Sequence, residues 1–285
     1  MKADEVKSVG IVGGGTMGSG IAQTCATAGL QVVLVDLALE QLTKAQGAIN
    51  ASLAKLQAKQ QLPADSATIA GRIRTSTNVE DLRGVDLAIE AAFEDPAVKE
   101  DLFRKLDQAC KADTVLTSNT SSISITRLAA ATKRSERVAG MHFMNPVPLM
   151  PLVEVVRGLQ TSDETIGFVK GVAERLGKTP IESRDVPGFI SNRVLMPLIN
   201  EAFFALEERV GTAEDIDTVM RLGMNHPMGP LALADLIGLD VCLAVLQVLQ
   251  RDLGEDKYRP APLLRSYVAA GWLGRKNGRG VYSYD

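Results

Sequence analysis

The sequence predicts an α/β protein, in which a mostly parallel sheet with a long helical insertion (residues 1–184) precedes a smaller all-α domain (residues 185–285). Two patterns support this prediction. Short apolar, β-rich runs alternate with helical stretches through the first part of the chain, as in proteins built on parallel sheets. From Pro187 onward this alternation stops and amphipathic helical patterns dominate. The length of 285 residues also suits two domains of roughly 150 residues each.

Composition narrows the possible classes of function. The formal net charge of −3 gives no general attraction to nucleic acid or to an anionic membrane, so neither is an expected partner. The first residues lack the apolar core of a signal peptide, and no run approaches the ~20 apolar residues of a membrane span. Cys25, Cys110 and Cys242 are dispersed, without disulfide or metal-ligand spacing, and are expected to be small core residues. We therefore expect a soluble cytoplasmic protein without a metal site.

A glycine-rich loop near the N-terminus is the strongest local signal. The β-rich run Val6–Val12 ends in Gly13, Gly15 and Gly18, which form G-x-G-x-x-G before a helical stretch. Such a loop permits a tight turn, lets the backbone approach a pyrophosphate and packs the new helix closely on the strand. A second apolar run ends in Asp36, whose carboxylate can accept hydrogen bonds from both hydroxyls of an adenosine ribose and would repel a 2′-phosphate. The arrangement predicts a Rossmann-like domain that binds NAD rather than NADP.

The segment from Leu39 to Leu62 is predicted to be one helix, longer than the usual crossover helix of such a domain. It carries Ser52, Lys55 and Lys59, and the two lysines are one turn apart, so both can point to one side. They could clamp a phosphorylated substrate or simply form a solvated helix face. On these residues alone, the solvated face is the favoured interpretation.

Polar side chains gather where the next predicted strands end. Glu90 and Glu94 lie at the end of one strand, and Lys99 opens the following helix, from which it can reach the nicotinamide side or pair with Glu94. The segment Thr117–Ile125 is rich in hydroxyl and amide side chains, more than are needed to cap the next helix. Because ligands of such folds bind at the carboxyl ends of the strands, Ser121 is our candidate donor to a substrate oxygen.

One of the two histidines, His142, ends a predicted strand that begins at Arg137, and a proline-rich loop follows it. Prolines stiffen such a loop, which can fold the carboxylate of Glu154 back towards the histidine. A histidine oriented by a carboxylate is the arrangement of a general base. A structural histidine in a turn explains this stretch equally well by itself. The convergence of polar loop, histidine and carboxylate at strand ends favours the catalytic interpretation.

The helical part of the chain adds one candidate residue and one surface. Asn192 lies in the first turn of a new helix, where its amide suits a substrate carbonyl or hydroxyl, although a plain helix-terminal residue is the alternative. His226 lies between Asn and Pro in a loop and is expected to be structural. The remaining helices carry much Met- and Leu-rich surface for so small a domain. This surface suggests a homodimer formed through the C-terminal domain.

Taken together, these motifs make the chain similar from end to end to the L-3-hydroxyacyl-CoA dehydrogenases, especially the short bacterial 3-hydroxybutyryl-CoA dehydrogenases. The resemblance rests on V-G-I-V-G-G-G-T-M-G-S-G-I-A-Q, S-N-T-S-S, H-F-M-N-P-V-P-L-M-P-L-V-E, D-V-P-G-F-I-S-N-R and H-P-M-G-P-L-A-L-A-D. It implies a catalytic set of Ser121, His142, Glu154 and Asn192. The NAD site that it implies contains Gly13, Gly15, Thr16, Met17, Gly18, Asp36, Glu94, Lys99, Asn119, Ser121, Asn145 and Lys276. The acyl-CoA site that it implies contains Ser52, Lys55, Lys59, Ser121 and Asn192, so a lysine clamp becomes the favoured interpretation of the long helix.

The reaction implied by this resemblance is the reversible oxidation of the C3 alcohol of an (S)-3-hydroxyacyl-CoA. His142 would remove the hydroxyl proton, hydride would pass to the nicotinamide, and Glu154 would stabilise the imidazolium. Two related activities remain open. One is an L-gulonate dehydrogenase or lambda-crystallin-like activity without CoA. The other is a 3-hydroxyadipyl-CoA dehydrogenase, in which Arg193 or Arg127 could meet the distal carboxylate. A non-catalytic NAD-binding protein is disfavoured, because it gives no reason to keep all four catalytic residues.

Overall fold

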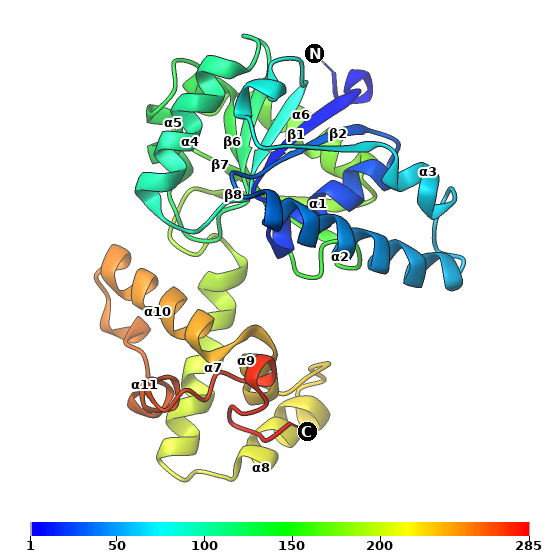
Figure 1. Ribbon diagram of the computed structural model, residues 1–285. Coiled ribbons are helices and arrows are strands. Elements are labelled where there is room, and N and C mark those ends of the chain that lie inside the picture. The colour runs from blue at the N-terminus through cyan, green and yellow to red at the C-terminus, as the bar shows by residue number, and fades with distance from the viewer. Residues whose placement is uncertain (1, 285) are drawn as a thin grey trace. The chain divides into compact units, whose positions relative to one another are not determined.

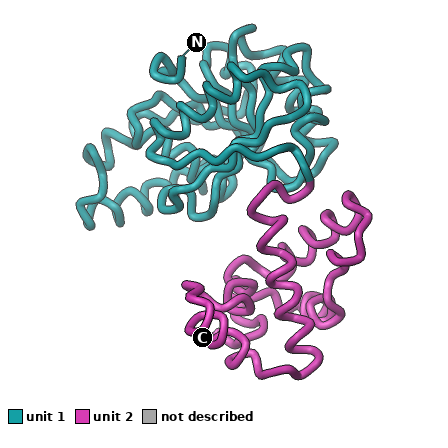
Figure 2. The backbone as a smooth tube through the Cα atoms, turned by 180° about the vertical axis from the view of Figure 1, so that it is seen from behind, with its two compact units in different colours: residues 1–186 teal, residues 187–285 magenta. Residues whose placement is uncertain are grey.

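The computed structural model describes residues 2–284. The chain divides into two compact units, residues 1–186 and residues 187–285, which are shown in different colours in Figure 2 and are described separately here. The predicted boundary, after residue 184, lies two residues earlier.

The first unit is built on an eight-stranded sheet in the order β3-β2-β1-β4-β5-β6-β7-β8 (Figure 1). Neighbouring strands are parallel except for β6 and β7, which are antiparallel. The mostly parallel sheet predicted from the sequence is therefore confirmed. The strands are β1 (Ser8–Val12), β2 (Gln31–Val35), β3 (Ile73–Ser76), β4 (Leu87–Glu90), β5 (Val115–Ser118), β6 (Val138–Phe143), β7 (Leu152–Arg157) and β8 (Thr179–Arg184).

Helices cover both faces of this sheet. Figure 1 shows α1 (Thr16–Thr27), α2 (Leu39–Ala58) and α6 (Asp163–Arg175) on one face, and α4 (Pro96–Ala109) and α5 (Ile125–Ala130) on the other. The first three helices share one buried core with apolar side chains of β1, β2 and β7. The parallel strands are consequently buried between two helical layers, which explains their near-continuous apolar sequences.

The long helix of the insertion ends earlier than predicted. α2 stops at Ala58, Lys59 is its C-cap, and Leu62 lies beyond it. The chain turns there at Gln60, which has a positive φ of 56°, and then enters the short helix α3 (Ser66–Ala70), capped by Asp65. The helical pattern of the sequence continues through the turn and therefore does not mark this boundary.

The second unit is helical, as predicted. Its helices are α7 (Ser191–Glu207), α8 (Ala213–Thr218), the π-helical turn η4 (Val219–Gly223), α9 (Pro230–Ile237), α10 (Leu239–Leu253) and α11 (Pro262–Ala269). They enclose their own core, which includes Phe203, Leu231 and Leu246. In the part of this unit that the structure describes, β-pairing is limited to two isolated bridges near the C-terminus.

Across residues 2–284, no helix taken singly has both the length and the apolar character needed to cross a membrane. α9 and α10 meet that criterion only as a pair, and they are bent by 97° where they join.

Candidate active site

The glycine loop between β1 and α1 has the shape of a dinucleotide site. Gly13 adopts a φ of +107°, and a Cβ atom there would press on the carbonyl of Ala91. A Cβ at Gly18 would collide with the carbonyl of Gly13, whereas the Cβ position of Gly15 has no heavy atom within 4 Å. Gly15 is also the N-cap of α1 and offers no side-chain cap. The first turn of α1 therefore keeps N–H groups available for an anion. Because the loop carries glycines, the anion can come close to its backbone.

Asp36 follows β2 and returns to this loop. Its Oδ2 accepts the N–H of Gly14 at 2.7 Å and its Oδ1 accepts that of Ala38 at 3.0 Å. Each carboxylate oxygen has a further lone pair available for a ribose hydroxyl. The negative charge beside the loop would repel a phosphate on the ribose 2′ position, so the residues present fit NAD.

His142 and Glu154 form a buried pair. They are opposite each other in the antiparallel β6–β7 ladder, with Nδ1 of the histidine 2.8 Å from Oε2 of the glutamate. His142 is 8% exposed and Glu154 is 1% exposed. The contact expected from the sequence is thus present. A ring that donates from Nδ1 to a carboxylate is held in the tautomer whose basic nitrogen is Nε2.

The loop that joins these two strands is fixed by a lysine. Lys178, in the turn between α6 and β8, donates from Nζ to the carbonyl oxygens of Val147 at 2.6 Å and Met150 at 2.8 Å. The Asn145–Pro146 peptide bond in this loop is cis. Lys178 is only 8% exposed, and burial lowers the pKa of its ammonium group. Lys178 was not predicted as a site residue, because a lysine just after a helix gives no local sign of such distant acceptors.

The polar segment after β5 is bonded to the strands on either side of it. The N–H of Asn119 donates to the carbonyl of Glu90 at 2.7 Å, and its Oδ1 accepts the N–H of Phe143 at 2.9 Å. The N–H of Ser121 donates to Oε1 of Glu94 at 3.1 Å. Ser121 is thus carried by a loop that is bonded directly to the residue after His142.

A buried lysine lies beneath this segment. Lys99 is 1% exposed, and its Nζ lies 2.6 Å from Oε1 of Glu90 and 3.2 Å from Oε2 of Glu94. The predicted pairing with Glu94 is present. Glu90, which the sequence placed only at a strand end, is the closer partner. Two carboxylates therefore share one ammonium group in this cluster.

Comparison with known proteins bears on both units. Residues 8–186 match the family model of the 3-hydroxyacyl-CoA dehydrogenase NAD binding domain, and residues 188–284 match the C-terminal domain of the same enzymes. The chain belongs to the 3-hydroxyacyl-CoA dehydrogenase family. Both parts of the predicted resemblance, the NAD-binding domain and the helical domain, are confirmed by these matches.

Individual members of the 3-hydroxyacyl-CoA dehydrogenase family resemble the chain over nearly its whole length. A probable 3-hydroxybutyryl-CoA dehydrogenase of Deinococcus radiodurans is 54% identical over 275 residues, which cover 96% of this chain and 99% of the relative. The crystal structure of (S)-3-hydroxybutyryl-CoA dehydrogenase from Ralstonia eutropha is 51% identical, with a TM-score of 0.95 over 99% of this chain and 100% of that one. A 3-hydroxyadipyl-CoA dehydrogenase of Escherichia coli is 44% identical over 98% of this chain and 59% of its own length.

Three of the residues predicted to bind the acyl-CoA, Ser52, Lys55 and Lys59, lie on α2 and at its end. Ser52 is half-buried, whereas Lys55 and Lys59 are exposed and form no ion pair with any residue in the described range 2–284. Lys44 on the same helix differs, because its Nζ lies 2.8 Å from Oε1 of Glu40. Two uncompensated cations thus stand at the carboxyl end of α2.

Two predicted site residues belong to the second unit. Asn192 is in the first turn of α7, where its N–H donates to the carbonyl of Gly188 at 3.1 Å. Lys276 holds Asp240, with its Nζ at 2.5 and 2.6 Å from the two carboxylate oxygens. The substrate role of Asn192 and the cofactor role of Lys276 stay predictions. The other predicted cofactor residues are in the first unit: Thr16 and Met17 begin α1, and Asn145 precedes the cis-proline.

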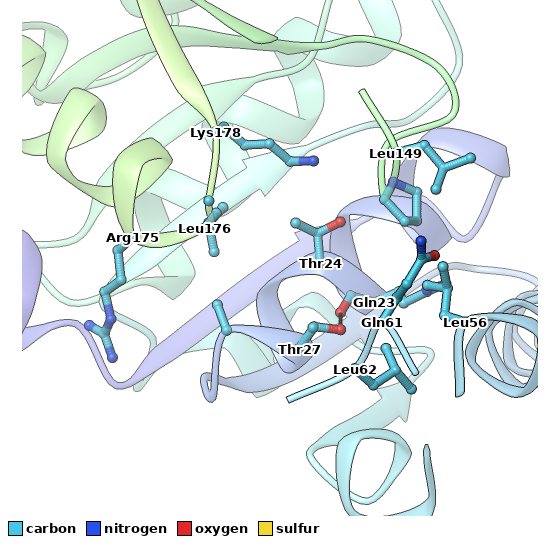
Figure 3. A pocket seen from close by; sticks show the side chains of 13 residues that line it. Gln23, Thr24, Thr27, Leu56, Gln61, Leu62, Leu149, Arg175, Leu176 and Lys178 are labelled. Atoms are coloured by element: carbon cyan, nitrogen blue, oxygen red, sulfur yellow. Dashed lines mark hydrogen bonds between the residues drawn. The ribbon is translucent and has the colours of Figure 1, made fainter. Parts of the chain in front are cut away.

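A cavity of about 610 Å³ lies elsewhere on the first unit (Figure 3). It is bounded by α1, the end of α2, the β6–β7 loop and the turn after α6, with Thr24, Leu62, Leu149 and Lys178 among its lining. None of the predicted site residues lines it. Within residues 2–284, no group of three or more His, Cys, Asp and Glu side chains is placed to hold a metal ion.

Proposed function

We propose that the protein catalyses the reversible NAD-dependent oxidation of an (S)-3-hydroxyacyl-CoA, with 3-hydroxybutyryl-CoA as its substrate, to the 3-ketoacyl-CoA. The observation that carries this proposal is the buried contact between His142 and Glu154, at 2.8 Å, in a chain whose two units both match one dehydrogenase family. The 54% identical relative from Deinococcus radiodurans, which carries the 3-hydroxybutyryl-CoA name, supports the choice of substrate.

The proposed mechanism assigns proton transfer to His142. In the direction of oxidation, Nε2 of the neutral ring takes the proton of the C3 hydroxyl, and the imidazolium that forms is stabilised by the carboxylate of Glu154. NAD, when bound, accepts the hydride from C3. Ser121 and Asn192 are assigned to hold the substrate oxygen and thioester, and such positioning can contribute ~7–11 kcal/mol to lowering the barrier. In the reverse direction the imidazolium returns its proton to the alkoxide oxygen.

The cofactor and the CoA group are assigned to separate parts of the first unit. Gly13, Gly15 and Gly18 approach the pyrophosphate, and Asp36 binds the ribose. Lys55 and Lys59 face solvent without an ionic partner in the described chain, so their charge is available to the CoA phosphates. The local charge is needed because the chain as a whole has a formal charge of −3.

The test is NADH oxidation by the purified protein with acetoacetyl-CoA, measured beside a series of longer 3-ketoacyl-CoAs, and with NADPH in parallel. We expect rapid turnover of acetoacetyl-CoA with NADH. Absence of turnover with every acyl-CoA, together with NAD reduction by L-gulonate, would instead place the protein in the sugar-acid branch.

A 3-hydroxyadipyl-CoA substrate is the second candidate, favoured by the 44% identical relative of Escherichia coli that carries this name. The residues offer it less support. Arg127 is bonded to Glu100, and the guanidinium of Arg193 lies 5.0 Å from the ring centroid of Tyr258. A higher kcat/KM for 3-ketoadipyl-CoA than for acetoacetyl-CoA in the same assay would favour this candidate.

We further propose a homodimer formed through the second unit. Five large apolar side chains there are more than half exposed: Val194 (68%), Val210 (75%), Val219 (58%), Leu222 (74%) and Met224 (60%). Apolar surface of this kind is typical of subunit contacts. Sedimentation of the wild type should give a dimer, and Leu222→Asp should weaken it. Leu159→Asp, which changes an even more exposed leucine (86%) in the first unit, is the control and should remain dimeric.

We also propose a cytoplasmic location. All three cysteines are free and buried, as suits a reducing compartment. Fractionation of cells that produce the protein would test this, and recovery from an oxidising compartment would contradict it.

A further inference from the structure

A buried carboxylate outside the proposed mechanism joins several parts of the site. Glu90 is the last residue of β4 and is 0% exposed. Its Oε1 accepts hydrogen bonds from Nζ of Lys99 and from the N–H of Ala92, both at 2.6 Å. Its Oε2 accepts the hydroxyl of Ser118 at 2.6 Å. A carboxylate is expensive to bury unless its oxygens are hydrogen-bonded and its charge is paired, and Glu90 meets both conditions.

The partners of Glu90 lead directly to the loop that carries Ser121. The hydroxyl of Ser118 accepts the N–H of Thr120 at 3.1 Å, which fixes the first turn of the loop. Glu94, the second carboxylate on Lys99, accepts the N–H of Ser121 at 3.1 Å and is also bonded to the hydroxyl of Thr120. Two routes therefore connect Glu90 to one short loop, one through Ser118 and one through Lys99.

The second route depends on competition for one cation. Nζ of Lys99 is 2.6 Å from Glu90 and 3.2 Å from Glu94, so Glu90 takes the larger share of the charge. Glu94 consequently keeps Oε1 on the loop while only Oε2 approaches the lysine. Without the charge on Glu90, Lys99 would attract Glu94 more strongly and draw it away from Thr120 and Ser121.

We propose that Glu90 is a positioning residue for the dehydrogenation: it holds Lys99 and Ser118 so that Glu94 stays bonded to the loop that carries Ser121. This inference rests on the proposed function. Glu90 itself touches none of the four proposed catalytic residues in the contacts described above, and acts through its neighbours.

Glu90→Gln is the decisive substitution. The amide oxygen can still accept from Lys99, but the amide nitrogen is a donor and cannot accept the hydroxyl of Ser118. The variant also removes the charge that competes with Glu94. We expect kcat for acetoacetyl-CoA reduction to fall by on the order of 10- to 100-fold, while KM for acetoacetyl-CoA stays nearly unchanged. A small displacement of positioned groups affects the transition state most.

Asp86→Asn is the matched control. Asp86 precedes the same strand at its opposite end and accepts Nζ of Lys111 at 2.8 Å and the N–H groups of Lys7 at 2.8 Å and Ser8 at 3.0 Å. The Asp86→Asn variant thus loses the same kind of charged hydrogen-bond network, but away from the proposed site. Its melting temperature should fall while its kcat stays at the wild-type value.

Ser118→Ala carries the test if Glu90→Gln does not fold. It removes only the hydroxyl between Glu90 and Thr120, and should lower kcat with KM maintained. In a double variant, the loss in kcat should be smaller than the product of the two single losses, because both changes break one connection.

A wild-type kcat in Glu90→Gln would show that Glu90 only stabilises the fold. If Glu90→Gln does not fold, a wild-type kcat in Ser118→Ala would show the same. Either result would overturn the inference and leave the proposed function intact. A wild-type protein that turns over no acyl-CoA would overturn the proposed function, and the inference with it.

Discussion

His142 and Glu154 are register partners across β6 and β7, and this is why their side chains meet at 2.8 Å. Side chains directly opposite each other in an antiparallel pair point to the same face of the sheet and lie close together. The contact is thus set by the backbone ladder rather than by the reach of a flexible loop.

Replacement of His142 should remove catalysis and leave cofactor binding. We expect His142→Gln to lower kcat by about 10²- to 10⁴-fold, the usual contribution of general acid–base catalysis, with NADH affinity unchanged. Stopped-flow turnover and NADH fluorescence measure the two quantities separately. His226→Gln, at the other histidine of the chain, is the control and should have the kcat of the wild type. Near-normal turnover by His142→Gln would refute the assignment of the base.

Removal of the charge at Asp36 should relax the choice of cofactor. Asp36→Asn keeps an oxygen that can accept the N–H of Gly14, as Oδ2 does at 2.7 Å, but abolishes the repulsion of a 2′-phosphate. KM for NADH should rise by on the order of tenfold through the loss of a charged hydrogen bond, and KM for NADPH should fall. Steady-state kinetics with both cofactors give the ratio. An unchanged preference for NADH over NADPH would show that another residue discriminates between the two cofactors.

Removal of Lys59 should weaken binding of the CoA thioester without slowing the chemistry. We expect Lys59→Ala to raise KM for acetoacetyl-CoA, to leave kcat at saturation unchanged, and to show a smaller effect as salt is added. Lys44→Ala removes the same charge from the same helix, but Lys44 is paired with Glu40 at 2.8 Å. If the two variants raised KM equally, Lys59 would be only one contributor to a general positive field.

Lys178 should give the stability of the protein a dependence on alkaline pH. Burial lowers the pKa of its ammonium below the ordinary value of 10.5, so the folded chain releases this proton at a lower pH than the unfolded chain does. The charged form therefore costs stability near neutral pH. That cost is relieved as pH rises through the lowered pKa towards 10.5. The lysine keeps its loop contacts after deprotonation, because a neutral amine still has two N–H groups for its two carbonyl acceptors.

Denaturant unfolding of the wild type and of Lys178→Met at several pH values measures this effect. The free-energy difference between them should shift in favour of the wild type as pH rises through the lowered pKa of Lys178 towards 10.5. A difference between wild type and Lys178→Met that is constant with pH would contradict the prediction.

Local patterns made much of this architecture predictable. The glycine loop, Asp36 and the strand ending near His142 are each defined by a few consecutive residues whose backbone preferences agree with the fold. The parallel sheet was predicted from the alternation of strands and helices. The helical domain was predicted because this alternation stops at Pro187. The end of α2 at Ala58 was missed, because the residues after it are as compatible with a helix as those before it.

Contacts between distant segments were not predictable in the same way. Lys178 bonds carbonyl groups 28 and 31 residues away, and a backbone carbonyl leaves no trace in a sequence. The hydroxyl of Ser118 reaches Glu90 across 28 residues, although both were visible as polar residues at strand ends. Their side chains meet because β4 and β5 are neighbours with Glu90 opposite Ser118, and only the sheet register shows that.

The antiparallel β6–β7 pair also has a consequence for how the chain folds. His142 and Glu154 are 12 residues apart, whereas Gly14 and Asp36 are 22 apart and are separated by a complete helix. A hairpin forms in about 1–10 μs, and short loops lose less entropy on closure than long ones. The proposed base and the carboxylate that stabilises its imidazolium are therefore joined by a contact of low sequence separation, which needs neither a crossover helix nor a bound dinucleotide to form.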